Sequence, residues 1–179
     1  MDNNDILIRL RYALDIKDVD MLKMFEIGGM KVSKEELKKL LIKTKTSYHL
    51  DASNIDDIDD MDEEENERCS NKMLECFLNG FIVFKRGENK AADGTVIKKA
   101  LTLKENVVVN NVLLKKVKIA LELSGDDMMT IITKSGVTIS KGELSAFFRK
   151  EGHKHYRTCG DHYARNFLKG LSMTYRKSS

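Results

Sequence analysis

The sequence has no run of apolar residues long enough to cross a membrane. No stretch approaches the roughly 20 apolar residues that a membrane-spanning helix requires. The first residues, MDNNDILIRL, also lack the basic region followed by an apolar one that marks a secretion signal. The three cysteines are widely spaced and odd in number, which argues against a disulfide framework and fits a reducing compartment. We therefore expect a cytoplasmic protein with no membrane partner.

Catalytic motifs are also missing from the sequence. There is no glycine-rich phosphate loop, because Gly28, Gly29 and Gly125 do not belong to one. Carboxylates lie close together only between Asp51 and Glu67, where solvation explains them better than acid–base chemistry. We predict no catalytic residues and no cofactor, and an enzyme is the less expected class of protein.

Charge is distributed unevenly along the 179 residues, although 41% of them are hydrophobic and can form a core. Ten acidic residues and no basic one occur between Asp51 and Glu67. Without those ten, 18 acidic residues face 31 lysines and arginines, which leaves a net charge of +13. One acidic segment therefore interrupts an otherwise basic protein.

An internal repeat organises the chain. Residues 3–43 align with residues 110–150 without a gap, and 13 of the 41 pairs are identical. A second block, residues 69–81, aligns with residues 159–171 and shares the cysteine and the Phe-Leu-x-Gly sequence. The second alignment needs a shift of 90 positions where the first needs 107, so the first copy has 17 extra residues. These fall at about 44–68, which makes the acidic segment an insertion into the repeat unit.

Each copy has the sequence pattern of about four helices. Apolar residues at helical spacing mark the first helix, for which Asn4 and Asn111 are the expected N-caps. A Ser-x-x-Glu capping box precedes the third helix at Ser33 and again at Ser140. We predict an all-α fold of two tandem, pseudo-symmetric units that pack on each other. The expected ranges are 1–86 for the first unit, 87–109 for a polar linker with a short hairpin at residues 92–94, and 110–179 for the second unit.

Several segments resemble the bacterial YehS-like family of uncharacterised proteins. They are NNDILIRLRYALDI, VSKEEL, FLNGFIVFKRG, NNVLLKKVKIALEL and SKGELSAFFRKEGHKHYRTCGDHYARNFLKGL. Family members usually have proline where this chain has Glu151 and Thr158, and they lack so long an acidic insertion. The resemblance implies a bacterial cytosolic protein of two tandem units, and it implies no reaction, ligand or catalytic residue.

A group of histidines and a cysteine near the C-terminus allows two sharper interpretations. His153, His155, Cys159 and His162 have a spacing that could hold zinc, but the first copy lacks the histidine pair. Cys159 with Asp161 and His162 also supplies the residue types of a nucleophilic site. A buried cysteine at a helix start and solvated histidines explain the same residues, so we predict no metal site.

The basic segment of the second unit is the strongest functional candidate. Cations lie beside aromatic rings there, a combination that suits contacts with phosphates and bases. The candidate residues are Arg149, Lys150, His153, Lys154, Tyr156, Arg157, Arg165 and Lys169. We predict a binding module with nucleic acid as partner. The alternative is a protein-interaction or self-association module, and the acidic insertion could either cover the basic surface or only aid solubility.

Overall fold

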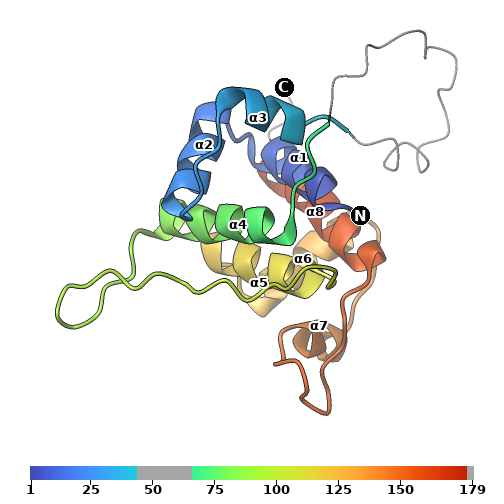
Figure 1. Cartoon of the computed structure of the whole chain (residues 1–179). Coiled ribbons are helices and arrows are strands. Elements are labelled where there is room, and N and C mark those ends of the chain that lie inside the picture. Colours follow the sequence, from blue (N-terminus) through green and yellow to red (C-terminus); the bar gives the residue numbers. More distant parts are fainter. Residues whose placement is uncertain (44–65, 177–179) are drawn as a thin grey trace, which may run out of the picture.

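The computed structural model describes residues 1–43 and 66–176, and within them all regular structure is helical (Figure 1). The helices of the first unit are α1 (Asn3–Leu14), α2 (Asp18–Ile27), α3 (Lys34–Leu40) and α4 (Asn71–Arg86). Those of the second unit are α5 (Asn110–Ala120), α6 (Gly125–Lys134), α7 (Lys141–Phe147) and α8 (Asp161–Tyr175). The prediction of an all-α protein with four helices in each unit is confirmed for this part of the chain. None of these helices is long and apolar enough to cross a membrane.

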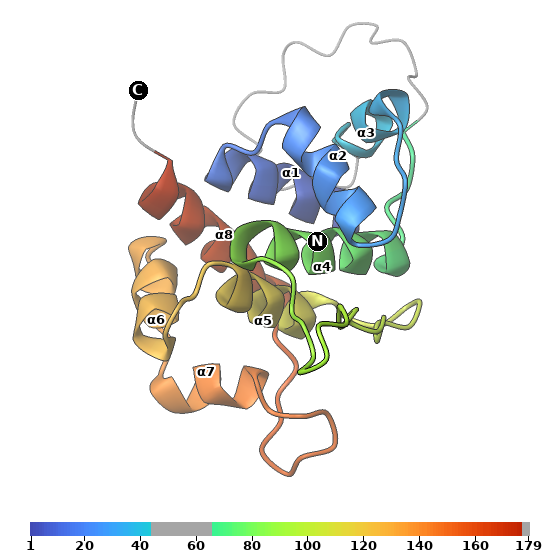
Figure 2. The ribbon, with the colours of Figure 1, turned by 90° about the vertical axis from the view of Figure 1, so that its left-hand side faces the viewer.

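The two units exchange helix partners where they pack on each other. Within each unit the second helix packs on the fourth, so that α2 contacts α4 and α6 contacts α8. The first helix of each unit packs mainly on the last helix of the other, so that α1 contacts α8 and α5 contacts α4 (Figures 1 and 2). Both kinds of contact occur twice, at matching positions of the repeat. The predicted pseudo-symmetry is therefore confirmed, and the buried side chains form one core that both units share.

Helices α1 and α8 run in the same direction along their interface. At their first residues, the amino group of Met1 forms an ion pair with Asp161. At their last residues, a guanidinium nitrogen of Arg176 donates a hydrogen bond of 3.2 Å to the carbonyl oxygen of Tyr12. The two helices therefore begin together and end together.

Helices α4 and α5 repeat this parallel arrangement in the other half. Asn71, in the first turn of α4, donates a hydrogen bond of 3.3 Å to the carbonyl oxygen of Val107, just before α5. Arg86 at the end of α4 forms an ion pair of 2.6 Å with Glu122 beyond the end of α5. Arg86 and Arg176 are equivalent in the repeat, so both interfaces end in an arginine contact. All four helices begin at one end of the molecule (Figure 1).

Two glycines, one in each unit, allow the backbones of neighbouring helices to approach closely. A Cβ atom on Gly80 of α4 would lie 1.7 Å from the carbonyl oxygen of Met24 in α2. A Cβ atom on Gly170 of α8 would lie 1.8 Å from the carbonyl oxygen of Ile131 in α6. Both glycines and both carbonyls occupy equivalent positions in the repeat. Only glycine lets the helix backbones approach so closely, because any side chain would collide with backbone atoms.

The predicted capping boxes of the third helices are confirmed. The hydroxyl of Ser33 accepts a hydrogen bond of 3.1 Å from the Glu36 amide, and the Glu36 carboxylate accepts one of 2.6 Å from the Ser33 amide. Ser140 and Glu143 form the same pair of bonds, of 3.2 Å and 2.9 Å. These bonds satisfy backbone groups that would otherwise have no partner inside the helix.

The expected N-cap role of Asn4 and Asn111 is wrong. The N-cap of α1 is Asp2, whose carboxylate accepts a hydrogen bond of 2.7 Å from the amide of Asp5, and α5 has no side-chain cap. Asn4 and Asn111 lie inside the first turn of their helices and are buried. Their side chains turn inward because more distant backbone groups, which sequence spacing cannot reveal, compete successfully for the amide.

Asn4 binds both ends of the chain segment that connects α3 to α4. Its side-chain nitrogen donates to the carbonyl oxygens of Leu40 at 2.9 Å and Glu67 at 2.8 Å. Its side-chain oxygen accepts from the amide of Cys69 at 2.9 Å. The same amide therefore stabilises the end of α3 and the start of α4.

Asn111 does the same for the connection between α7 and α8. It donates to the carbonyl oxygens of Phe147 at 3.0 Å and Arg157 at 2.8 Å, and it accepts from the amide of Cys159 at 2.8 Å. Every partner is the repeat equivalent of a partner of Asn4. The asparagine therefore belongs to the repeat unit itself, together with the buried cysteine.

The linker between the units begins with a turn and returns along α4. The hairpin expected at residues 92–94 is present only as a turn closed by one isolated antiparallel bridge between Lys90 and Val96. The following residues run back across α4 and α5 toward the start of α5 (Figure 1). There the linker hydrogen-bonds to the fully buried carboxylate of Glu75 in α4.

Candidate functional site

The eight candidate residues fall into two groups in the structure. Six of them lie in the connection between α7 and α8, residues 148–160, which we call the basic loop. They are Arg149, Lys150, His153, Lys154, Tyr156 and Arg157. The remaining two, Arg165 and Lys169, lie on α8 itself. The basic loop projects from the helical body at the bottom of both views (Figures 1 and 2).

Backbone hydrogen bonds shape the basic loop. The amide of His153 donates to the carbonyl oxygen of Lys150 at 3.0 Å, and the amide of Tyr156 donates to that of His153 at 2.8 Å. The amide of Arg157 donates to the carbonyl oxygen of Ala146 at 3.2 Å, which joins the end of the loop to α7. With the bond from Asn111 to Arg157, these contacts hold the loop in one shape although most of its side chains are exposed.

Four cations on the basic loop face solvent. Arg149, Lys150, Lys154 and Arg157 are exposed, and Glu151 is the only acidic residue between positions 148 and 160. Among the described residues, none of the four cations forms an ion pair within 4.0 Å. Within the described residues, the positive charge of the loop is therefore free of direct ion pairs.

Glu143 at the base of the loop responds to this charge. Hydrogen bonds from the side chain and backbone of Ser140 lower the pKa of the Glu143 carboxyl, and the positive charge of Arg157 lowers it further. Tyr156 is half-buried and presents only part of its ring to solvent. The loop is therefore mainly a cationic surface that also carries the exposed rings of His153 and His155, whose centres lie 5.7 Å apart with their planes tilted by 46°.

Arg165 lies at a separate site, a cleft where α1, α4, α5 and α8 begin. The cleft has a volume of about 950 Å³ and is lined by both units, with Arg68 and Asp5 from the first and Asn110 and Arg165 from the second. The Nε atom of Arg165 is buried and makes no hydrogen bond in the part of the chain that the structure describes, although the positive charge of Arg165 helps to lower the pKa of Asp161. Lys169, one turn further along α8, is exposed. The structure therefore does not join these two residues to the basic loop.

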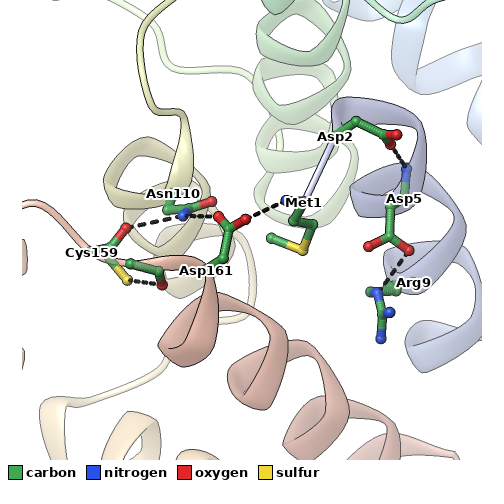
Figure 3. A network of polar contacts seen from close by, with 8 residues as sticks. Met1, Asp2, Asp5, Arg9, Asn110, Cys159 and Asp161 are labelled. Carbon is green, nitrogen blue, oxygen red and sulfur yellow. Dashed lines mark hydrogen bonds and ion pairs between the residues drawn. The ribbon is translucent and has the colours of Figure 1, made fainter. Parts of the chain in front are cut away.

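A polar network closes the second unit's side of this cleft (Figure 3). The side-chain nitrogen of Asn110 donates to the carbonyl oxygen of Cys159 at 3.0 Å and to the carboxylate of Asp161 at 2.9 Å. Burial alone would raise the pKa of Asp161, but the hydrogen bonds from the Met1 amino group and Asn110 outweigh it and lower that pKa. Asp161 is thus a carboxylate that is already occupied by partners.

On the other side of the cleft, the Nε atom of Arg9 forms an ion pair of 2.9 Å with Asp5, one turn earlier in α1 (Figure 3). Arg9 is the repeat equivalent of Lys116. The sequence comparison pairs these two bases, but it does not reveal that Lys116 bonds to Glu75 of the opposite unit whereas Arg9 bonds to Asp5 of its own helix.

The cysteine and histidines that allowed a metal or nucleophile interpretation are spread apart. Cys159 is buried, and burial raises the pKa of its thiol to about 12, so it carries little thiolate near neutral pH. His153 and His155 lie at the tip of the basic loop, whereas His162 packs against Tyr163 on α8. In residues 1–43 and 66–176, no three histidine, cysteine or acidic side chains converge on a common point.

A family model supports the repeat found in the sequence. The model described as "Protein of unknown function (DUF1456)" matches residues 3–87 and again residues 110–177. The chain belongs to this family. It is also 33% identical to "Uncharacterized protein YehS" of Escherichia coli (strain K12) over 172 residues, which cover 96% of this chain and 95% of that protein. No solved structure matches the chain.

The acidic insertion lies mostly outside the described residues. Of the predicted insertion at about 44–68, the structure describes only residues 66–68. Among these, Asn66 and Arg68 line the cleft that also contains Arg165. Whether the insertion covers a basic surface stays a prediction.

Proposed function

We propose that the protein binds nucleic acid through the basic loop, by contacts with the phosphate backbone. The observation that carries this proposal is the cluster of exposed cations on a loop that projects from the body, none of which forms an ion pair with another described residue. Lysines and arginines that neutralise phosphates release condensed counterions, which is the main source of sequence-independent affinity. A loop whose shape is already fixed loses little conformational freedom on binding.

The difference between the two units also supports this proposal. The connection between α3 and α4 is the repeat equivalent of the basic loop, and it carries the ten acidic residues between 51 and 67. Phosphate contacts are therefore expected from the second unit alone. We also propose a cytoplasmic location, where the three free cysteines would stay reduced.

A salt titration tests the proposal. The fluorescence anisotropy of a labelled 20-base-pair duplex, and of a labelled single strand of the same length, would be measured against protein concentration at several salt concentrations. The test variant combines Arg149→Ala, Lys150→Ala and Lys154→Ala. If each cation contacts one phosphate of the duplex, the slope of log K against log salt becomes shallower by about 2.7.

A matched control separates the loop from overall charge. A variant with Lys31→Ala, Lys38→Ala and Lys39→Ala removes the same charge from exposed positions at α3. Its salt slope should stay within about 1 of the parent's, because these lysines lie in the other unit. Absence of binding to both probes at low salt would contradict the proposal, and so would an equal loss in the two variants.

A further inference from the structure

The linker covers a face formed by α4 of the first unit and α5 of the second. The fully buried carboxylate of Glu75 accepts hydrogen bonds from the amides of Thr102 at 2.8 Å and Leu103 at 2.7 Å. It also accepts an ion-pair hydrogen bond of 3.1 Å from Lys116 of α5. One turn earlier on α4, Asn71 donates a bond of 2.7 Å to the carbonyl oxygen of Lys104. The linker is therefore fastened to this face by part-buried hydrogen bonds, several of which end on the carboxylate of Glu75.

Toward the end of α4, a pocket lies between the linker and the two helices. Val83 of α4 and Ile119 of α5 line a pocket of about 590 Å³ together with Ile97 and Leu101 of the linker. Since Thr102 and Leu103 lie near the start of α4, the linker runs antiparallel to this helix. The side chains of Ile97 and Leu101, with two lysines between them, therefore precede the residues that bond to Glu75.

The repeat places an equivalent face on α8 and α1. Positions 71, 75, 79, 83 and 86 of α4 correspond to Asp161, Arg165, Lys169, Met173 and Arg176 of α8. Positions 116 and 119 of α5 correspond to Arg9 and Tyr12 of α1. This second set of residues is named the α1–α8 face below.

The α1–α8 face is the more exposed of the two. Val83 and Ile119 are half-buried beside the linker, whereas their equivalents Met173 and Tyr12 are 55% and 56% exposed. Among the described residues, no segment hydrogen-bonds to the side chains of Arg165 or Lys169 in the way that the linker bonds to Glu75 and Asn71. Within the described residues, the linker therefore covers the α4–α5 face, whereas on the α1–α8 face the guanidinium of Arg176 lies over the Tyr12 ring, 3.9 Å from its centre.

The charge of the α1–α8 face is inverted at its centre. Glu75, which accepts hydrogen bonds from backbone amides, is replaced by Arg165, which can only donate. Lys116 is replaced by Arg9, so both positions are basic on this side, although the Nε atom of Arg9 already forms an ion pair of 2.9 Å with Asp5. The buried Nε atom of Arg165 has no acceptor in the described structure. A segment that covered this face would have to bring carboxylates where the linker brings amides.

We propose that the α1–α8 face binds an extended acidic segment of another protein. The segment lies antiparallel to α8, with an apolar residue against Met173 and the part of Tyr12 that Arg176 leaves exposed, and with carboxylates a few residues later against Arg165 and Arg9. Charge complementarity and the linker's arrangement on the equivalent face both argue for this occupant. The proposal does not depend on the basic loop, which faces solvent elsewhere on the molecule (Figure 2).

A peptide copied from the linker provides the probe. It contains residues 95–108 with Thr102→Glu, Leu103→Glu and Lys104→Glu, so that carboxylates stand where the linker's amides meet Glu75. The unchanged sequence of residues 95–108, which is basic, is the control peptide. Binding of the fluorescein-labelled peptides to the full-length protein would be followed by anisotropy, and only the acidic peptide is expected to bind.

Variants of the face test where the peptide binds. Arg165→Glu and, separately, the exposed Lys169→Glu should each weaken binding of the acidic peptide by at least about tenfold, the effect of losing one charge-assisted bond. Lys154→Glu, an equal charge change on the basic loop, should leave peptide binding unchanged. Circular dichroism would show whether each variant is folded. If Arg165→Glu does not fold, the exposed Lys169→Glu variant still tests where the peptide binds.

Three results would overturn the proposal. The first is failure of the acidic peptide to bind, and the second is an equal loss in the Lys154→Glu variant. The third is binding only to a chain that lacks residues 52–65, which would make the protein's own acidic insertion the occupant. Unchanged duplex binding by Lys169→Glu would support a protein-binding face that is separate from the nucleic-acid site. If Lys169→Glu instead lost as much duplex affinity as the basic-loop variants, the α1–α8 face would belong to the nucleic-acid site.

Discussion

Replacement of Gly80 by alanine tests the packing between the second and fourth helices most sharply. The added methyl group would lie 1.7 Å from the carbonyl oxygen of Met24, and ordinary contact begins at 3.4 Å. The obstacle is backbone on a neighbouring helix, so no side-chain rotation can relieve it. Helices α4 and α2 must separate, which also disturbs the contact between the rings of Phe25 and Phe77, 5.2 Å apart.

The expected loss of stability in Gly80→Ala follows from two opposing effects. Overpacking of a well-packed core costs about 1–3 kcal/mol, and a backbone collision places this substitution at the upper end. Alanine regains about 1 kcal/mol through its higher helix propensity. We expect a net loss of about 2 kcal/mol in the free energy of unfolding, or a fall of about 4–8 °C in Tm. Gly170→Ala should lose a similar amount, because Ile131 holds the equivalent position.

Thermal and urea unfolding, followed by circular dichroism, would measure these losses. Gly142→Ala is the matched control, since its Cβ atom meets nothing within 4 Å in the exposed first turn of α7. It should raise stability by about 0.5–1 kcal/mol. Equal or higher stability of Gly80→Ala relative to the parent would refute the proposed close approach of α2 and α4.

Three further predictions concern polar contacts. Asn4→Ala or Asn111→Ala leaves backbone partners without a hydrogen bond and should lower the free energy of unfolding, measured in urea, by about 2–4 kcal/mol. A loss smaller than that of a surface alanine substitution would contradict the role of these asparagines in joining the helices. Ser33→Ala and Ser140→Ala should each lower the unfolding free energy by about 1 kcal/mol, and unchanged melting curves would argue against the caps. Burial of the Glu75 carboxyl opposes its ionisation, but the hydrogen bonds outweigh burial and lower its pKa below 4.5. Ionised Glu75 therefore stabilises the fold above pH 4.5, and this stabilisation is lost as the pH falls through the lowered pKa. Glu75→Gln should flatten the decline of stability below that pH, and an unchanged profile would contradict it.

The helices could be predicted well from the sequence because their signals are local. The capping boxes at Ser33 and Ser140 depend on residues three positions apart, and the apolar spacing marks each buried face. The exchange of partners between units has no such signal. Two aligned copies show that Asn4 and Asn111 are equivalent, but not which helix each side chain faces. The N-cap expectation failed for this reason.

The candidate site residues also divide into those that a local sequence signal predicts and those that depend on helix packing. The positive charge of residues 149–157 is visible in the sequence, and the structure places these residues on one loop. Arg165 and Lys169 are close to them in sequence but lie on α8. Sequence could not separate the two groups because the direction of a side chain on α8 depends on how α1 packs against it. The repeat alignment contained one signal that the sequence analysis did not use, namely that Glu75 of the first copy aligns with Arg165 of the second.

Mapping the nucleic-acid contact by NMR tests the central claim most directly. The backbone amide signals of the full-length, isotope-labelled protein would be recorded while the 20-base-pair duplex is added at low salt. The account predicts that the largest shifts fall within residues 149–157 and vanish at high salt. Shifts concentrated in α1 and the exposed side of α8, or no shifts at any salt concentration, would contradict it.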